Sequence, residues 1–126
     1  MLELMQNLSW VAVIAGTVTA FVAGWIWYSP LLFGDQWADG LDVHMGTRIP
    51  IVPMVCQVAG LFLLSLFVGV SIDVSALVIL ILGALAFLLL GFSGESFAGH
   101  PMAVRLINAG YWVLALMVLV LVHALI

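Results

Sequence analysis

Side chains able to do chemistry gather after the first and third apolar segments of the chain. After the first segment, Asp35, Asp39 and Asp42 have the i, i+4, i+7 spacing that puts them on one face if the stretch is helical. Such carboxylates, with His44 nearby, can bind a hard divalent cation. The calcium-loop pattern and paired His or Cys spacings are missing from the sequence, so we expect a solvated acidic face and no metal or cofactor.

A second group of polar side chains surrounds the start of the last apolar segment. Arg105 and Asn108 are spaced i, i+3 and share a helix face, and Glu95 or an aspartate of the first group is a candidate partner for Arg105. An ionisable side chain this close to an apolar span is a functional hypothesis by default. The alternative is that Arg105 extends its charged end to the lipid headgroups.

The candidate polar and interfacial site joins these side chains to the aromatic segment that ends the first span, because Trp and Tyr rings suit the headgroup layer. It comprises Trp27, Tyr28, Ser29, Pro30, Phe33, Trp37, Glu95, Arg105, Asn108 and Tyr111. Gln57 is a candidate for a polar pathway through the protein, although amides in membrane helices more often hydrogen-bond to a neighbouring helix.

The sequence lacks the patterns of common catalytic sites. It contains no Gly-rich phosphate loop, no nucleophile elbow and no zinc-binding helix. The single cysteine, Cys56, has no partner for an internal disulfide and is expected to be a small buried hydrophobe. We therefore expect no enzyme activity.

The composition indicates that the protein lives in a membrane. Of 126 residues, 67% are hydrophobic and 6% are charged, whereas an average soluble domain carries about 25% charged residues. Two arginines and six acids cannot cover a surface that faces water. Nucleic acid is excluded as a partner because no basic patch exists to neutralise phosphates.

The elements that position the candidate site are four apolar segments of membrane-spanning length. We predict an all-α polytopic membrane protein in a single domain, 1–126, with transmembrane helices over about 8–28, 50–70, 74–91 and 101–125. The first segment lacks the basic start and cleavage site of a signal peptide, so we expect it to remain on the protein. The third segment is the most apolar and is expected to face lipid.

Polar residues between these segments predict turns and helix caps. Ser29 before Pro30 predicts the start of a short surface helix, and Ser71 or Asp73 is expected to cap the third span. Residues 93–100 predict a polar turn, with His100 capping the fourth span.

Small residues form one stripe along the first span. Ala12, Gly16, Ala20 and Gly24 are spaced by four, which lets another helix backbone approach closely. We predict that this helix-packing stripe is a main contact surface of the first span.

A short similarity suggests an internal repeat. Residues 28–33 and 92–97 both read aromatic-Ser-x-x-x-Phe, and each follows an odd-numbered span. A duplicated unit would make spans one–two and three–four two parallel-repeat helical hairpins.

Basic residues predict the orientation in the membrane. Arg48 and Arg105 both belong to the side of the first and third connections. The positive-inside rule therefore puts these connections in the cytoplasm and both termini in the periplasm.

The segment Gly24–Gly34 and the segment Arg105–Tyr111 carry a resemblance to a known family. The first reads Gly-x-x-Trp-Tyr-Ser-Pro-x-x-Phe-Gly and the second Arg-Leu-Ile-Asn-Ala-Gly-Tyr. The chain resembles a family of small four-helix bacterial inner-membrane proteins of unknown function, in which a Trp such as Trp10 opens the first span. Here Asp35 follows the Phe-Gly, where the family often has a basic residue. The resemblance implies a fold and a location but no activity.

The leading functional hypothesis is a non-enzymatic membrane protein that works by helix–helix association, either as a homo-oligomer or as an accessory subunit of a larger complex. Its partners would be membrane lipids and either itself or other membrane subunits. The main alternative is a small channel or carrier for ions or small solutes, lined by Gln57, Arg105 and Asn108. A weaker alternative is a lipid-binding protein at the cytoplasmic interface.

Overall fold

The protein is a bundle of four long helices with a short helix at one end. A computed structural model describes residues 6–41 and 51–126. Its helices are α2 (Trp10–Trp27), α3 (Gly34–Leu41), α4 (Ile51–Asp73), α5 (Leu77–Phe97) and α6 (Met102–Leu125), and the described residues contain no strand. All but α3 are long and apolar enough to cross a membrane. The predicted all-α fold with four transmembrane helices is confirmed.

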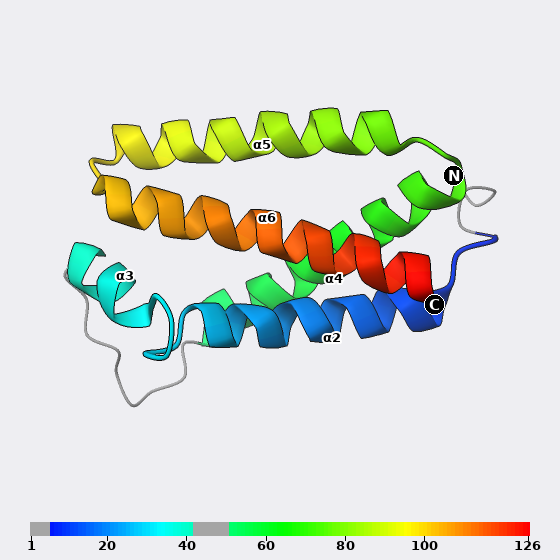
Figure 1. Cartoon of the computed structure of the whole chain (residues 1–126), viewed down its shortest axis with the longest axis horizontal. Helices are drawn as coiled ribbons and strands as arrows, with labels where there is room; N and C mark the ends of the chain where they lie inside the picture. Colours follow the sequence, from blue (N-terminus) through cyan, green and yellow to red (C-terminus); the bar gives the residue numbers. More distant parts are fainter. Residues whose placement is uncertain (1–5, 42–50) are drawn as a thin grey trace.

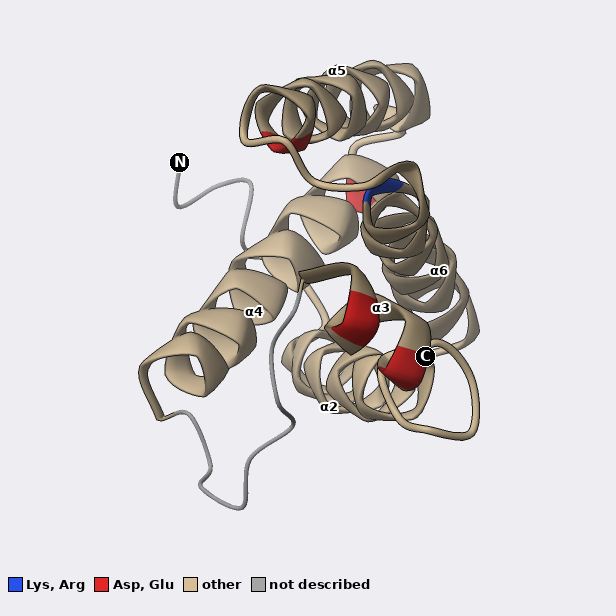
Figure 2. Cartoon of the chain, turned by 90° about the vertical axis from the view of Figure 1, so that its left-hand side faces the viewer, with Lys and Arg blue, Asp and Glu red and all other residues tan. Residues whose placement is uncertain are grey.

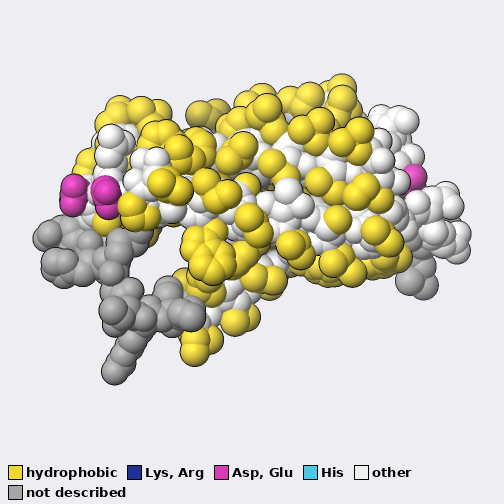
Figure 3. Space-filling model, turned by 60° about the horizontal axis from the view of Figure 1, so that its bottom comes forward, with side chains coloured by type: hydrophobic (Ala, Val, Ile, Leu, Met, Phe, Trp, Pro, Cys, Tyr) yellow, Lys and Arg dark blue, Asp and Glu magenta, His cyan; other side chains and the backbone are white. Residues whose placement is uncertain are grey.

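Consecutive long helices run antiparallel, so that the bundle has two distinct ends (Figure 1). One end holds the start of α2, the α4–α5 connection and the end of α6. The other holds α3 and the α5–α6 connection, and we call it the α3 end. Figure 3 shows a broad apolar surface between acidic side chains at the two ends, the pattern expected of a protein that spans a membrane.

The connection between α4 and α5 lies later in the chain than predicted. Helix α4 continues through Asp73, and the Ser71 hydroxyl donates a 2.7 Å hydrogen bond to the Phe67 carbonyl of its own helix. Ala76 is the N-cap of α5 and makes no side-chain capping bond. The prediction that Ser71 or Asp73 caps the third span is therefore wrong, because the hydroxyl is used within α4.

The polar turn predicted over 93–100 is also wrong for most of its length. Helix α5 runs on to Phe97, because the Ser96 hydroxyl donates to the Phe92 carbonyl at 2.8 Å and so satisfies itself inside the helix. Pro101 is the N-cap of α6 without a side-chain bond, so His100 does not cap that helix. The extension brings Glu95 onto the last turns of α5.

The segment after α2 is a compact turn that leads into α3. Ser29 donates from its hydroxyl to the Ile26 carbonyl at 2.6 Å, and α3 begins at Gly34 instead of Pro30 as predicted. A Cβ at Gly34 would collide with the carbonyl oxygen of Tyr28, so only glycine fits this close approach. Residues 28–33 are thus a turn whereas 92–97 are helical, and their shared motif does not mark a structural repeat.

The core forms where α2 packs against α6 and α4. Ala12, Gly16, Ala20 and Gly24 are all buried in this contact. A Cβ at Gly16 would lie 2.9 Å from both the Leu119 Cδ2 and the Ser65 Oγ atoms. The helix-packing stripe is therefore filled by the chain's own helices, which leaves none of it for contact with another protein.

Helix α5 lies at the edge of the bundle, as its composition predicted. Only 6% of its most apolar window is buried, against 33% for α2, and Leu80 is its one buried residue. Phe67 of α4 lies near Gly83 of α5, and from there the two helices diverge toward the α3 end (Figure 2). Cys56, expected to be buried, lies exposed on the apolar surface of α4.

Candidate interfacial site

Asn108 on α6 is the centre of a hydrogen-bond network at the α3 end. Its Oδ1 atom accepts from the Tyr28 hydroxyl at 2.7 Å and from the Trp37 indole N–H at 3.0 Å. Its Nδ2 atom donates to Glu95 Oε1 at 3.2 Å. One amide thus joins the end of α2, α3, α5 and α6, which fixes how these elements meet.

Aromatic rings enclose this network on the α2 side. The Tyr28 ring lies 5.4 Å from Trp37 and 5.6 Å from Tyr111, in edge-to-face geometry. The Trp27 indole N–H donates to the Ile107 carbonyl at 2.9 Å, and the Trp27 and Phe33 rings are 4.6 Å apart. These contacts hold the turn after α2 against the first turns of α6.

Burial raises the pKa of the Tyr28 phenol well above its usual value, and the neighbouring Tyr111 and Glu95 reinforce that shift. The hydroxyl therefore keeps its proton across the ordinary pH range. It therefore remains a donor to Asn108 across that range.

Tyr111 links three helices deeper in the bundle. Its hydroxyl donates to the Ala20 carbonyl at 3.0 Å and accepts from the Gln57 amide at 3.2 Å. Gln57, the candidate pathway residue, is in this way engaged in a helix–helix hydrogen bond between α4 and α6. The ring of Tyr111 is almost completely buried, which explains why Gly24 lies opposite it on α2.

Arg105 faces α5 on the other side of Glu95. Its Nη1 atom donates to the Ser96 hydroxyl at 2.7 Å, and its guanidinium carbon lies 4.9 Å from the centre of the Phe92 ring. The expected partner, Glu95, makes no hydrogen bond with it. Glu95 Oε2, Arg105 Nε and His100 Nδ1 are buried without a hydrogen-bond partner among the described residues.

The structure thus brings most of the sequence-predicted site together, although its members differ in role. Ser29 bonds only to backbone and Pro30 is exposed, so both shape the turn without contributing a polar group to the network. Asp35 and Asp39 lie exposed on α3, whereas Asp42, His44 and Arg48 fall outside the described residues.

A second polar contact was not predicted from the sequence. Ser65, completely buried on α4, donates to the Val13 carbonyl at 3.0 Å and lies 3.0 Å from Nε2 of His123. Because the only hydroxyl proton goes to Val13, His123 must donate from Nε2 to the Ser65 oxygen. The pair therefore joins α2, α4 and α6 and does not have the geometry of an activated nucleophile. The one signal for this contact in the sequence was that Ser65 and His123 are polar residues at similar depths in two spans.

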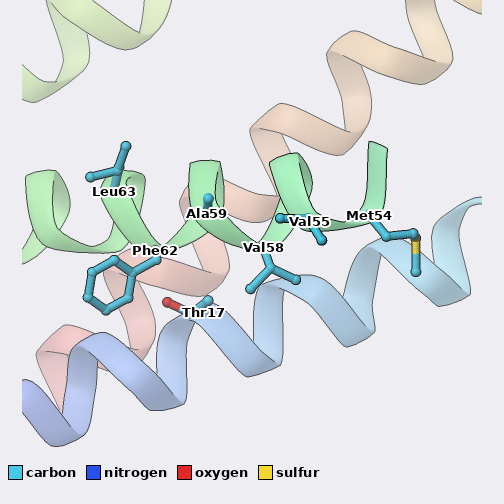
Figure 4. Close-up of a pocket in the computed structure, with 7 residues that line it drawn as sticks. All are labelled: Thr17, Met54, Val55, Val58, Ala59, Phe62 and Leu63. Atoms are coloured by element: carbon cyan, nitrogen blue, oxygen red, sulfur yellow. The ribbon is translucent and has the colours of Figure 1, made fainter. Parts of the chain in front are cut away.

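An open groove of about 660 Å³ runs between α2 and α4 (Figure 4). Its walls are apolar apart from Thr17, whose hydroxyl donates to the Val13 carbonyl at 2.8 Å. The groove offers no free polar group, as expected of a surface that faces lipid chains.

The fold and this site define a polytopic helical membrane protein with a hydrogen-bonded polar cluster at one end. The chain belongs to the family described as "Protein of unknown function (DUF1761)", whose model matches residues 11–124. The match includes every residue of the Asn108 network. Comparison with curated proteins and with solved structures found no match.

Proposed function

We propose that this protein is a non-catalytic membrane subunit that acts by lateral association, with a helix of another chain entering between α4 and α5. The other chain is either a second copy or another subunit of a complex. The proposal rests on one observation, namely that the helical glycines of the described chain fall into two groups with different surroundings.

Glycines of the first group are required by packing within the chain. A Cβ would lie 2.7 Å from Tyr111 Oη at Gly24, 2.7 Å from His123 Cε1 at Gly69 and 2.8 Å from Trp27 Cζ2 at Gly110. At these positions no larger residue fits without movement of the neighbouring side chain. They account for the close approach of α2, α4 and α6 to one another.

Glycines of the second group have no such neighbour. A Cβ at Gly60, Gly91 or Gly94 would have no atom within 4 Å. Glycine inside a helix is about 1 kcal/mol less favourable than alanine, and nothing within the chain requires it here. In membranes, small residues on an open face are typical of places where a second helix packs closely.

The open glycines face the region where α4 and α5 diverge. Gly60 precedes Phe67 by two helical turns and so shares its stripe, and Phe67 is the residue that contacts α5 near Gly83. On α5, Gly91 lies one helical turn beyond Phe87 and lines the small cavity beside α6, and Gly94 follows one turn later. Figure 2 shows α4 and α5 diverging toward the α3 end, and Gly60, Gly91 and Gly94 lie on the diverging parts of the two helices.

The two stripes also match in depth. Gly60 lies 13 residues before the end of α4 and Gly91 lies 14 residues after the start of α5. At 1.5 Å per residue, each is about 20 Å from the shared connection. A single helix running between α4 and α5 would therefore meet glycines from both sides at one level.

The location that we propose is a bacterial inner membrane, with the α3 end in the cytoplasm and both chain termini in the periplasm. Support comes from Arg105 at that end and from the interfacial rings of Trp27, Tyr28 and Trp37. In a Cys56→Ser background, Asp39→Cys on α3 should resist an impermeant thiol reagent in intact cells and react after lysis. Rapid labelling of intact cells would reverse the orientation.

Cys56 gives a direct experiment on association, because it is exposed on the Gly60 stripe one turn away. If two copies meet through this stripe, mild oxidation of native membranes should produce a disulfide-linked dimer that Cys56→Ser abolishes. Gly60→Leu should suppress the dimer by filling the stripe. Ala59→Leu is the matched control, because it adds the same side chain about 100° around the helix.

Another subunit, in contrast, would give no Cys56 dimer but a defined protein that co-purifies with the wild type and is lost with Gly60→Leu. Retention of the same dimer or the same partner by Gly60→Leu would contradict the proposal. Ion flux through liposomes that hold the pure monomer would instead favour a channel.

A further inference from the structure

A small, partly open cavity lies between α5 and α6 at the α3 end. Its volume is about 50 Å³, and most of its lining is apolar, including Phe92 and Trp112. Two side chains of opposite charge, Glu95 and Arg105, also line it. The cavity thus has a mainly apolar lining with one hydrogen-bond acceptor, Glu95, and one donor, Arg105.

The charged groups at this cavity are incompletely paired by the protein. Glu95 accepts a hydrogen bond at Oε1 from Asn108, and Arg105 donates one from Nη1 to Ser96. The remaining atoms, Glu95 Oε2 and Arg105 Nε, are buried and have no partner among the described residues. A buried carboxylate oxygen or guanidinium N–H without a hydrogen bond is unfavourable, so a partner is expected for these two atoms.

We propose that the cavity is a hydration site in which one or two water molecules bridge Glu95 Oε2 and Arg105 Nε. The bridging species must donate to a carboxylate and accept from an N–H at the same time. Water does both, whereas a metal cation cannot accept from the guanidinium and an anion cannot donate to the carboxylate. The volume also fits, because a water molecule occupies about 30 Å³ in the liquid and needs two to four polar partners.

The bridge would complete an ion pair across α5 and α6 that the two side chains do not close directly. Helix α5 has little else to hold it, since Leu80 is its only buried residue. With the water in place, polar contacts run without a break from Tyr28 and Trp37 through Asn108 and Glu95 to Arg105 and Ser96. The hydrated cavity therefore adds to the direct Asn108–Glu95 and Arg105–Ser96 bonds that fix the α3 end of α5, whether or not a partner chain binds.

The direct experiment is a high-resolution structure of the full chain in lipid nanodiscs. We expect density for one or two waters within hydrogen-bond distance of both Glu95 Oε2 and Arg105 Nε. An empty cavity, or a direct contact between the two side chains, would overturn the proposal.

A solution measurement tests the same site without a structure. The infrared carboxylate band that Glu95→Gln removes should shift more in the wild type than in Arg105→Leu when H₂O is replaced by D₂O. The Asn108 amide hydrogen on Glu95 exchanges in both proteins, whereas the bridging water needs Arg105. Ser96→Ala is the control, since it removes a direct bond of Arg105 but no hydrogen bond of the cavity, and should leave the wild-type shift in place. Equal shifts in the wild type and Arg105→Leu would refute the bridge.

A double-mutant cycle measures how strongly the two side chains are coupled. For Glu95→Gln and Arg105→Lys we expect a coupling of about three-fold in the unfolding equilibrium constant, the average for polar contacts in membrane proteins. Strictly additive effects of the two substitutions would contradict the proposal.

Discussion

Asn108→Leu should destabilise the α3 end of the bundle more than the substitution of any other side-chain amide does. The substitution keeps the size of the side chain but removes all three of its hydrogen bonds, to Tyr28, Trp37 and Glu95. Hydrogen bonds in membrane proteins contribute about 0.6 kcal/mol on average and up to about 1.7 kcal/mol. Three of them give about 2 to 5 kcal/mol, since the partners remain part-buried without replacements.

The assay is reversible unfolding in mixed micelles of sodium dodecyl sulfate and a mild detergent. The change should appear in the free energy of unfolding, because the Tyr28 hydroxyl and the Trp37 indole N–H lose their acceptor. Thr19→Ala is the control, as the exposed Thr19 hydroxyl bonds only to Ala15 of its own helix. If the free energy of unfolding of Asn108→Leu lies within about 0.5 kcal/mol of the wild-type value, the network does not hold these elements together.

Three further substitutions test the packing. Gly24→Ala should destabilise by about 1–3 kcal/mol, because its methyl group would lie 2.7 Å from the hydroxyl oxygen of buried Tyr111. Gly94→Ala, the same change on an open face, should be neutral or stabilising by up to about 1 kcal/mol. Equal effects of the two substitutions in micelle unfolding would refute the division of the glycines into packed and open groups. Ser65→Ala should lower the free energy of unfolding by about 1–2 kcal/mol, because it leaves His123 Nε2 without its acceptor. The same micelle assay measures this change, and an unchanged stability would argue against the contact.

Composition predicted the class of protein because the physical constraint is simple. Four apolar segments separated by polar ones can cross a membrane in one way only, as helices whose backbone bonds close within each segment. The grouping of Tyr28, Trp37, Glu95 and Asn108 was also predictable. Antiparallel helices bring the ends of the first and third spans to the same side of the bundle as the start of the fourth, and all four side chains lie near these ends.

Features that depend on tertiary contacts could not be predicted in the same way. The stripe from Ala12 to Gly24 predicts close packing, but its spacing cannot say whether the other helix belongs to the same chain. Ser93 and Ser96 favour a turn in isolation, yet α5 continues through both because the Ser96 hydroxyl bonds to its own helix. Ser65 and His123 meet only because α4 and α6 both pack on α2.

The surface proposed for association therefore moves from α2 to α4 and α5. The sequence alone favoured the α2 stripe as the surface for association, and the structure fills that stripe from within the chain. The open glycines of α4 and α5 are now the feature that intrachain packing leaves unexplained. Association through those helices is the central claim of the account.

Native mass spectrometry after gentle extraction tests that claim most directly. The wild type should be observed as a defined assembly, either of several copies or with one co-purifying subunit, and Ala59→Leu should preserve it. Gly60→Leu should release a folded monomer that is no less stable than the wild type, because a Cβ at Gly60 has no atom within 4 Å. A wild-type protein that is strictly monomeric and free of protein partners would contradict the account.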